Sequence, residues 1–395
     1  MPKPRIAAIV TEYRPNSHAD VIVGKFLRAL PCDDGLHAPR IEIASLYLDQ
    51  VNPSDTGLET ARAFGVPVFP SVRAAVTLGG DAPAVDGVLV IGEHGDYPLN
   101  EKGQKLYPRR HLFEQVAGTL AGAGRSVPVF VDKHLSYNWP DALWIVERAR
   151  ELGMPLMAGS SLPVCWRRPW LETPPDARLD TALAIGYGDL EAYGFHALEV
   201  LQCMVERRAG GEKGVARVRC LEGAQVWEWL VGDGAMSALA EAAAGALSEP
   251  RGPWSAAPRL APGAAAFVLE YRDGMRGAVL MLEGYCRSFA YAAVAHNTVN
   301  ACEFVLQGGG PHAHFSYLCR NIEEMFLERR PAYPVERTLL TTGVLAAAMD
   351  SRYAGHTWIE TPDLAVHYTP DEAPHRPTGP RPSGVTLAPW PPEGM

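Results

Sequence analysis

The sequence contains no long hydrophobic run and no closely spaced pair of cysteines. No stretch approaches the roughly 20 apolar residues that a membrane-spanning helix needs, so we expect no membrane partner. The start of the chain has a short apolar run but not the longer apolar region and cleavage site of a signal peptide, so the expected location is cytoplasmic. The seven cysteines form no C-x-x-C pair and are expected to be free thiols.

A concentrated patch of positive charge is also missing. The formal net charge is -9, and the adjacent arginine pairs are scattered along the chain instead of forming one stripe. A chain of this charge would repel a polyphosphate backbone. We therefore expect a small-molecule substrate and no nucleic-acid partner.

The first part of the chain alternates short apolar runs with amphipathic stretches. This pattern is typical of a parallel sheet with helices on both faces, and 395 residues suit two domains. The sequence predicts a Rossmann-like, doubly wound α/β domain over residues 1–160. Its expected strands are 6–11, 41–47, 87–91, 127–131 and 156–159, and its expected helices are 19–30, 111–121 and 139–152.

A proline-punctuated segment after residue 161 marks a predicted boundary. Residues 161–360 are expected to form a C-terminal α+β domain with a mostly antiparallel open sheet, and residues 361–395 a proline-rich tail without periodicity. The expected strands are 215–221, 265–271, 277–282, 288–294 and 303–307. A helix over 189–207 opens the domain, and helices 236–247, 315–328 and 335–349 are expected to cover one face. An open sheet tends to find a partner, so we expect a homo-oligomer.

Four polar clusters follow the expected strands or lie on the opening helix. They span residues 12–20, 92–98, 132–134 and 191–196. Ligands of doubly wound sheets bind beyond the carboxyl ends of the strands, so we expect these clusters to line one site. Solvated loop residues with ordinary caps are the alternative interpretation.

The order of four segments, "VDGVLVIGEHGDYP", "VPVFVDKHLS", "GMPLMAGSSLP" and "EAYGFHALEVLQ", resembles the glucose-fructose oxidoreductase, inositol dehydrogenase and MocA family (Gfo/Idh/MocA). The resemblance implies a Rossmann domain that binds NAD or NADP and a second domain often used for oligomer contacts. It also implies hydride transfer on sugars, cyclitols or related polyols.

The resemblance assigns roles to three residues. Lys133 matches the lysine of the family's E-K-P motif, His196 matches the histidine of its D-x-x-x-H motif, and Asp49 matches the acid that binds a ribose. With His134, the first two are the candidate catalytic residues. The candidate cofactor contacts are Glu12, Asn16, Ser17, Asp49, Glu93 and His94. The candidate substrate contacts are Asp96, Tyr97, Tyr193, Arg109 and His314, although Arg109 could begin a solvated helix and His314 could cap one.

The chain departs from the family pattern at several positions. It has no glycine from residue 6 through residue 23, where the family has G-x-G-x-x-G/A, so any dinucleotide site is non-standard. Ala192 replaces the acid of D-x-x-x-H, and Asp132 and His134 flank Lys133 in place of glutamate and proline.

These departures leave two functions open. The first is an oxidoreductase acting on a small polar substrate. The second is a non-redox lyase, epimerase or hydrolase that uses lysine and histidine as acid and base, or a divalent metal such as Zn²⁺. The expected ligands of that metal are His94, His134, His196 and Glu191. A binding protein without catalysis is the third possibility, and the dense polar clusters argue against it.

Overall fold

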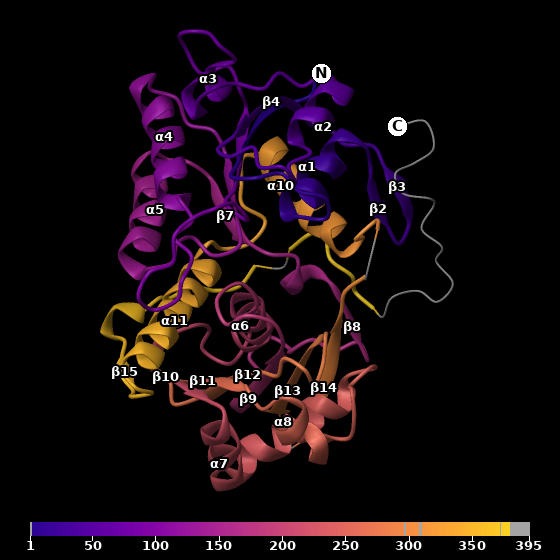
Figure 1. The fold of residues 1–395 in the computed structure, drawn as a ribbon, viewed down its shortest axis with the longest axis vertical. Coiled ribbons are helices and arrows are strands. Elements are labelled where there is room, and N and C mark those ends of the chain that lie inside the picture. Colours follow the sequence, from indigo (N-terminus) through magenta and orange to yellow (C-terminus); the bar gives the residue numbers. More distant parts are fainter. Residues whose placement is uncertain (1, 296–297, 308–309, 372, 380–395) are drawn as a thin grey trace.

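The described residues form two large β-sheets with helices packed on both, and a separate two-stranded hairpin (Figure 1). This computed structural model describes residues 2–295, 298–307, 310–371 and 373–379. The first sheet has five parallel strands in the order β4-β1-β5-β6-β7, and the second has eight strands in the order β15-β10-β11-β12-β9-β13-β14-β8. In the second sheet only the pair of β12 and β9 is parallel. The predicted fold class is confirmed.

The element bounds are as follows. The first half contains β1 (Arg5–Val10), α1 (His18–Leu27), β2 (Leu30–Cys32), β3 (Gly35–His37), β4 (Glu42–Leu48), α2 (Gly57–Phe64), α3 (Val72–Thr77), β5 (Gly87–Ile91), α4 (Arg109–Gly122), β6 (Val129–Asp132), α5 (Trp139–Glu151) and β7 (Leu156–Gly159). The second half contains β8 (Trp166–Arg168), β9 (Leu179–Gly186), α6 (Ala192–Val205), β10 (Val215–Glu222), α7 (Ala224–Gly232), α8 (Gly234–Ala246), α9 (Ala257–Leu260), β11 (Ala265–Tyr271), β12 (Arg276–Met281), β13 (Phe289–Ala295), β14 (Thr298–Val305), α10 (His314–Glu328), α11 (Glu336–Tyr353) and β15 (Ile359–Glu360).

The parallel sheet is covered on both faces because its strands are apolar on both. Side chains of α3, α4 and α5 pack on one face, and those of α1 and α10 pack on the other. Phe326 of α10 lies so close to Gly87 of β5 that a Cβ on this glycine would come within 2.5 Å of its ring. The predicted helix 315–328 therefore does not cover the second sheet. It returns to the first domain, where its apolar face completes the layer beside α1 (Figure 1).

The second sheet is also covered on both faces. Side chains of α7 and α8 pack on one face, and those of α6 and α11 pack on the other. The prediction that helices 236–247 and 335–349 share a face is therefore wrong, because β9, β12 and β13 alternate between two buried sides. Strand β9, in the middle of this sheet, was not expected, and neither was the hairpin of β2 and β3.

The end of the chain is anchored as far as it is described. Tyr368 donates a hydrogen bond to Glu206 at 2.8 Å, and the side chain of Asn321 contacts the backbone of His375. Of the predicted tail, residues 361–371 and 373–379 thus pack on the second domain and on α10. Residue 372 and residues 380–395 lie outside the described part. The predicted division at residues 160 and 360 stays a prediction.

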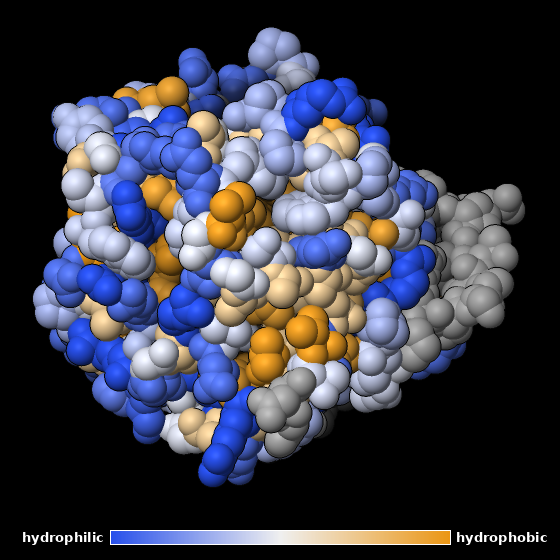
Figure 2. Space-filling view, turned by 90° about the horizontal axis from the view of Figure 1, so that it is seen from below, coloured by the Kyte–Doolittle hydropathy of each residue, from blue (hydrophilic) through white to orange (hydrophobic). Residues whose placement is uncertain are grey.

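Figure 2 views the molecule from the end at which α7 and α8 lie, and hydrophobic residues form small groups there among polar ones. Val231 of α7 is 87% exposed, but the sheet face behind these helices is buried. A homo-oligomer stays a prediction, and this sheet face is not the free surface expected for it. In the part of the chain that the structure describes, no helix combines the length and the apolar character needed to cross a membrane.

Candidate functional site

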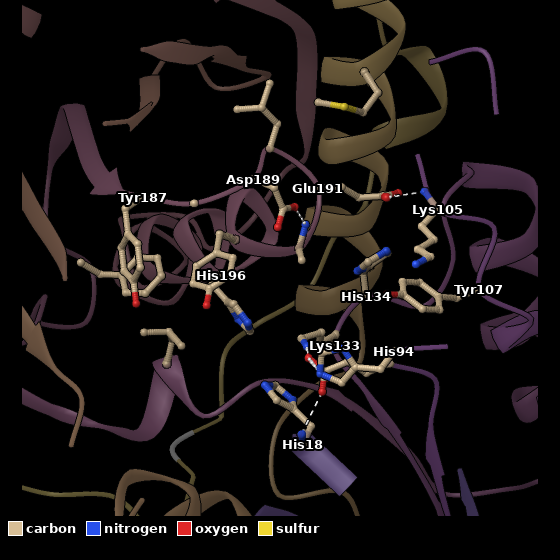
Figure 3. A pocket seen from close by; sticks show the side chains of 18 of the residues that line it. His18, His94, Lys105, Tyr107, Lys133, His134, Tyr187, Asp189, Glu191 and His196 are labelled. Carbon is tan, nitrogen blue, oxygen red and sulfur yellow. Dashed lines mark hydrogen bonds and ion pairs between the residues drawn. The ribbon is translucent and has the colours of Figure 1, made fainter. Parts of the chain in front are cut away.

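A cavity of about 890 Å³ lies between the carboxyl ends of the parallel strands and the second domain. Figure 3 shows His18, Lys133 and His196 directed toward a common space within it. The predicted residues that line the cavity are Asn16, Glu93, His94, Arg109, Lys133, His134, Glu191, Tyr193, His196 and His314. The structure therefore brings most of the predicted site together, from loops that are far apart in the sequence.

His18, the first residue of α1, belongs to this site although it was not among the predicted roles. Its Nδ1 lies 2.8 and 2.9 Å from the two carboxylate oxygens of Asp132, at the end of β6. When Nδ1 carries the proton it donates a hydrogen bond to this carboxylate, and in that tautomer the Nε2 lone pair is available to act as a base. Asp132 is 1% exposed and is held in place by the sheet, so it acts on His18 as a positioning residue.

Lys133 and Glu93 form a second acid-base pair beside the first. The Lys133 ammonium contacts Glu93 Oε1, while His94 Nε2 lies 3.6 Å from the same oxygen. Burial tends to raise the pKa of Glu93, but its neighbours, among them His18 and the Lys133 ammonium, outweigh burial and lower the pKa well below its usual range. Glu93 is therefore a fixed negative charge beside the lysine.

Three residues that line the cavity have a strained backbone. Asn16, His94 and Lys133 have φ values of 62°, 61° and 62°, a left-handed conformation that residues other than glycine rarely adopt. All three line the cavity, and each follows a strand of the parallel sheet. Strain of this kind persists where the surrounding structure enforces it, and it is common at functional sites.

His196 and His134 are both buried and neutral. Burial, reinforced by the charges of Lys133 and His18, lowers the pKa of His196 well below its usual value. Its Nδ1 is buried and has no hydrogen-bond partner among the described residues, while the ring lines the cavity. Burial and then the Arg109 charge likewise lower the pKa of His134. Since Nε2 of His134 already accepts a hydrogen bond from Arg109 at 3.0 Å, we assign His134 a positioning role.

Several predicted contacts lie outside the cavity lining. The Ser17 hydroxyl caps α1 by accepting from the backbone of Asp20 at 3.3 Å. Both carboxylate oxygens of Asp49 accept hydrogen bonds, from Tyr47 at 2.8 Å and from Tyr97 at 2.6 Å. The remaining two predicted residues outside the lining are Glu12, which pairs with Arg14 at 2.9 Å, and Asp96, whose backbone bonds Gln50.

The predicted metal ligands do not converge. Among the described residues, potential ligand atoms within 4.8 Å of one another occur in two groups, Cys32 with Asp34 and His37, and His18 with Glu93 and Asp132. The expected set of His94, His134, His196 and Glu191 is in neither group. Two of these ligand atoms already accept hydrogen bonds from the protein. Nε2 of His134 accepts from Arg109, and Oε2 of Glu191 accepts from the backbone amide of Lys105 at 2.8 Å. The predicted Zn²⁺ site is therefore corrected.

Glu199 of α6 gives the structure a pH dependence. The carboxyl group is 1% exposed and accepts hydrogen bonds from Ser160, and burial raises its pKa from 4.5 to about 7. Folding favours the protonated form of this group. The stability that depends on protonation is therefore fully present below pH 4.5, where the unfolded chain is also protonated, and it is lost as the pH rises toward 7. The loss amounts to about 3 kcal/mol.

The Glu199→Gln variant should lack this loss, because glutamine cannot ionise. The measurement is the free energy of unfolding from urea titrations at several pH values between 4.5 and 7. The matched control is Glu147→Gln, at an exposed position of α5, which should keep the slope of the unaltered protein. An unchanged slope in Glu199→Gln would contradict the assignment.

Comparison with family models gave no match, and neither did comparison with curated proteins. Solved structures do match. GenD2 from gentamicin A biosynthesis, in complex with NAD, is 14% identical over 91% of this chain and 97% of its own, with a TM-score of 0.56. The myo-inositol 2-dehydrogenase from Lactobacillus plantarum is 9% identical over 91% and 99%, with a TM-score of 0.57. An oxidoreductase from Agrobacterium radiobacter, in complex with NAD⁺, L-tartaric acid and magnesium, is 13% identical over 91% and 98%, with a TM-score of 0.55. These likenesses confirm the fold that the Gfo/Idh/MocA resemblance implies.

Proposed function

We propose that the chain is an enzyme of the oxidoreductase type that acts at a hydroxyl-bearing carbon of a small polyhydroxylated substrate. The observation that carries the proposal is the convergence of His18, Lys133 and His196 on one cavity from three separate elements. The solved structures of the same fold include a myo-inositol 2-dehydrogenase and GenD2 in complex with NAD. These neighbours support a sugar-like or cyclitol-like substrate.

The residues of this chain supply proton transfer. His18, oriented by Asp132, takes the proton of the reacting hydroxyl through Nε2, and the Lys133 ammonium donates a hydrogen bond to the developing negative oxygen. His196 bonds a neighbouring hydroxyl and fixes the orientation of the ring or chain. Oxidation of the carbinol also needs a hydride acceptor, a role that NAD or NADP fills in this fold class.

A second reaction class is favoured by one observation. The first amide of α1, at the position where a dinucleotide phosphate would lie in this fold class, donates to the Glu93 carboxylate at 2.9 Å. The observed residues therefore do not fit the usual dinucleotide pose. The same two acid-base pairs could carry a redox-neutral reaction, namely proton abstraction from carbon coupled to loss of an oxygen leaving group.

A substrate panel tests the proposed function. Sugars, cyclitols and their keto and acid derivatives are incubated with the protein, with and without NAD⁺ or NADP⁺. Substrate consumption is followed by NMR, and the reduced nicotinamide by absorbance. We expect at least one compound to be consumed, and we expect Lys133→Ala to stop its consumption. Consumption at the same rate by Lys133→Ala would place the active site elsewhere.

A further inference from the structure

The N-terminus of α1 is hydrogen-bonded to a side-chain carboxylate of this chain. In doubly wound sheets, the phosphates of a dinucleotide are bound by free amides at the start of the helix that follows the first strand. Here the amide of His18 donates to Glu93 Oε2 at 2.9 Å, and the amide of Asn16 donates to Asp20 Oδ2 at 2.9 Å. The Ser17 hydroxyl accepts from the amide of Asp20, so two of the first three amides of this helix, those of His18 and Asp20, donate to side chains.

The Glu93 carboxylate is fixed in this position. Lys133 holds its other oxygen, and the Thr11 hydroxyl donates to the Glu93 main-chain carbonyl at 2.5 Å. With its pKa held low by the charges that outweigh burial, Glu93 stays ionised. A phosphate at this place would be repelled by the Glu93 carboxylate, which Lys133 and the His18 amide hold in position.

The groove over the ends of β1 and β4, where the adenosine half of a dinucleotide would run, is bridged. The loop after β5 crosses it with three hydrogen bonds, from Tyr97 to Asp49 at 2.6 Å and between Asp96 and Gln50 at 2.7 and 3.2 Å. Asp49 also accepts from Tyr47, so both of its oxygens are occupied. Side chains of this chain therefore bond groups at both ends of the usual dinucleotide site.

We infer that the Glu93 carboxylate takes the place of the dinucleotide phosphate, and that the chain works without a dinucleotide in this groove. The inference rests on the active site of the proposed function, and it favours the second reaction class named there, a redox-neutral reaction on a polyol derivative that carries a carbonyl, over oxidation. His18 removes a proton from the carbon beside the carbonyl, and the C–H electron pair becomes a C=C bond. The C–O bond at the next carbon then breaks, and its electrons leave with the oxygen, which takes a proton from Lys133. No oxidant or reductant enters this balance.

The test is a titration of the full chain with NADH and NADPH, followed by nicotinamide fluorescence and by calorimetry. We expect no saturable binding up to about 1 mM, a free energy weaker than about -4 kcal/mol. Saturable binding that Asp49→Ala weakens at least tenfold would overturn the inference, because that response requires the groove. Binding that Asp49→Ala leaves unchanged would place the ligand outside the groove and leave the inference standing.

A second measurement separates this inference from the proposed function. Consumption of a substrate without added dinucleotide, lost in Lys133→Ala, supports the inference. Consumption only when NAD⁺ or NADP⁺ is present overturns it, while the assignment of the active site remains. If variants of the cavity residues all keep full activity, the proposed function fails, and the NADH titration still decides whether the groove is closed.

Discussion

Replacing His18 by alanine is expected to lower turnover by about 10²–10⁴-fold, the contribution of a positioned general acid or base. The Nδ1 of His18 is held by the Asp132 carboxylate while the ring lines the cavity. The measurement is kcat on a compound identified in the substrate panel, with folding checked by thermal unfolding. A variant with normal kcat would remove His18 from the proposed reaction.

The structure provides a matched control for this variant. His37 on β3 also pairs with an acid, Asp34, at 2.8 Å, but this pair is exposed and does not belong to the cavity lining. His37→Ala should therefore keep full turnover. Asp132→Asn tests the positioning role, since an amide can still contact His18 but cannot balance its charge. We expect kcat to fall in Asp132→Asn while KM changes little; a change in KM alone would indicate a role in substrate binding instead.

The strands of the parallel sheet could be predicted because a strand that is buried on both faces has apolar residues at consecutive positions. β5 is buried at all five positions and was predicted with its observed bounds. β9 escaped prediction although it is also buried along most of its length, because it follows a proline-rich segment and consists largely of small residues. The sequence marks a buried strand clearly only where its side chains are large or β-branched.

The position of α10 shows what amphipathic patterns leave undetermined. The pattern correctly predicts a helix with one apolar face, but not the surface on which that face packs. The choice depends on complementary shape, since Phe326 fits over Gly87 of a strand that is far away in the sequence.

The site was predictable in outline because parallel strands end at one edge. That rule grouped Glu93 and Lys133, and the family resemblance added His196 from the helix that opens the second domain. The partners within the group were not predictable. His18 and Asp132 are 114 positions apart, and Tyr97 and Asp49, whose contact closes the groove, are 48 apart. Such pairs depend on side-chain directions that no spacing in the sequence encodes.

Replacing Glu206 by alanine is expected to destabilise the protein by about 3–5 kcal/mol, the usual cost of breaking a buried ion pair. Glu206, at the end of α6, is 1% exposed and accepts two hydrogen bonds from Arg337 Nε of α11, at 2.8 and 3.1 Å. Tyr368 donates to the same carboxylate. Removing it leaves the buried Arg337 guanidinium without its counter-charge. The measurement is the free energy of unfolding from urea titration.

Two further variants separate the lost charge from the lost contacts. In the double variant Glu206→Leu with Arg337→Met, no buried charge remains unpaired, so we expect most of the loss to be recovered. Glu151→Ala removes the partner of Arg148 from an exposed pair on α5, and it should change stability little because solvent screens that pair. If Glu206→Ala were as mild as Glu151→Ala, water would have to reach Arg337, and the junction between α6 and α11 would be more open than its burial indicates.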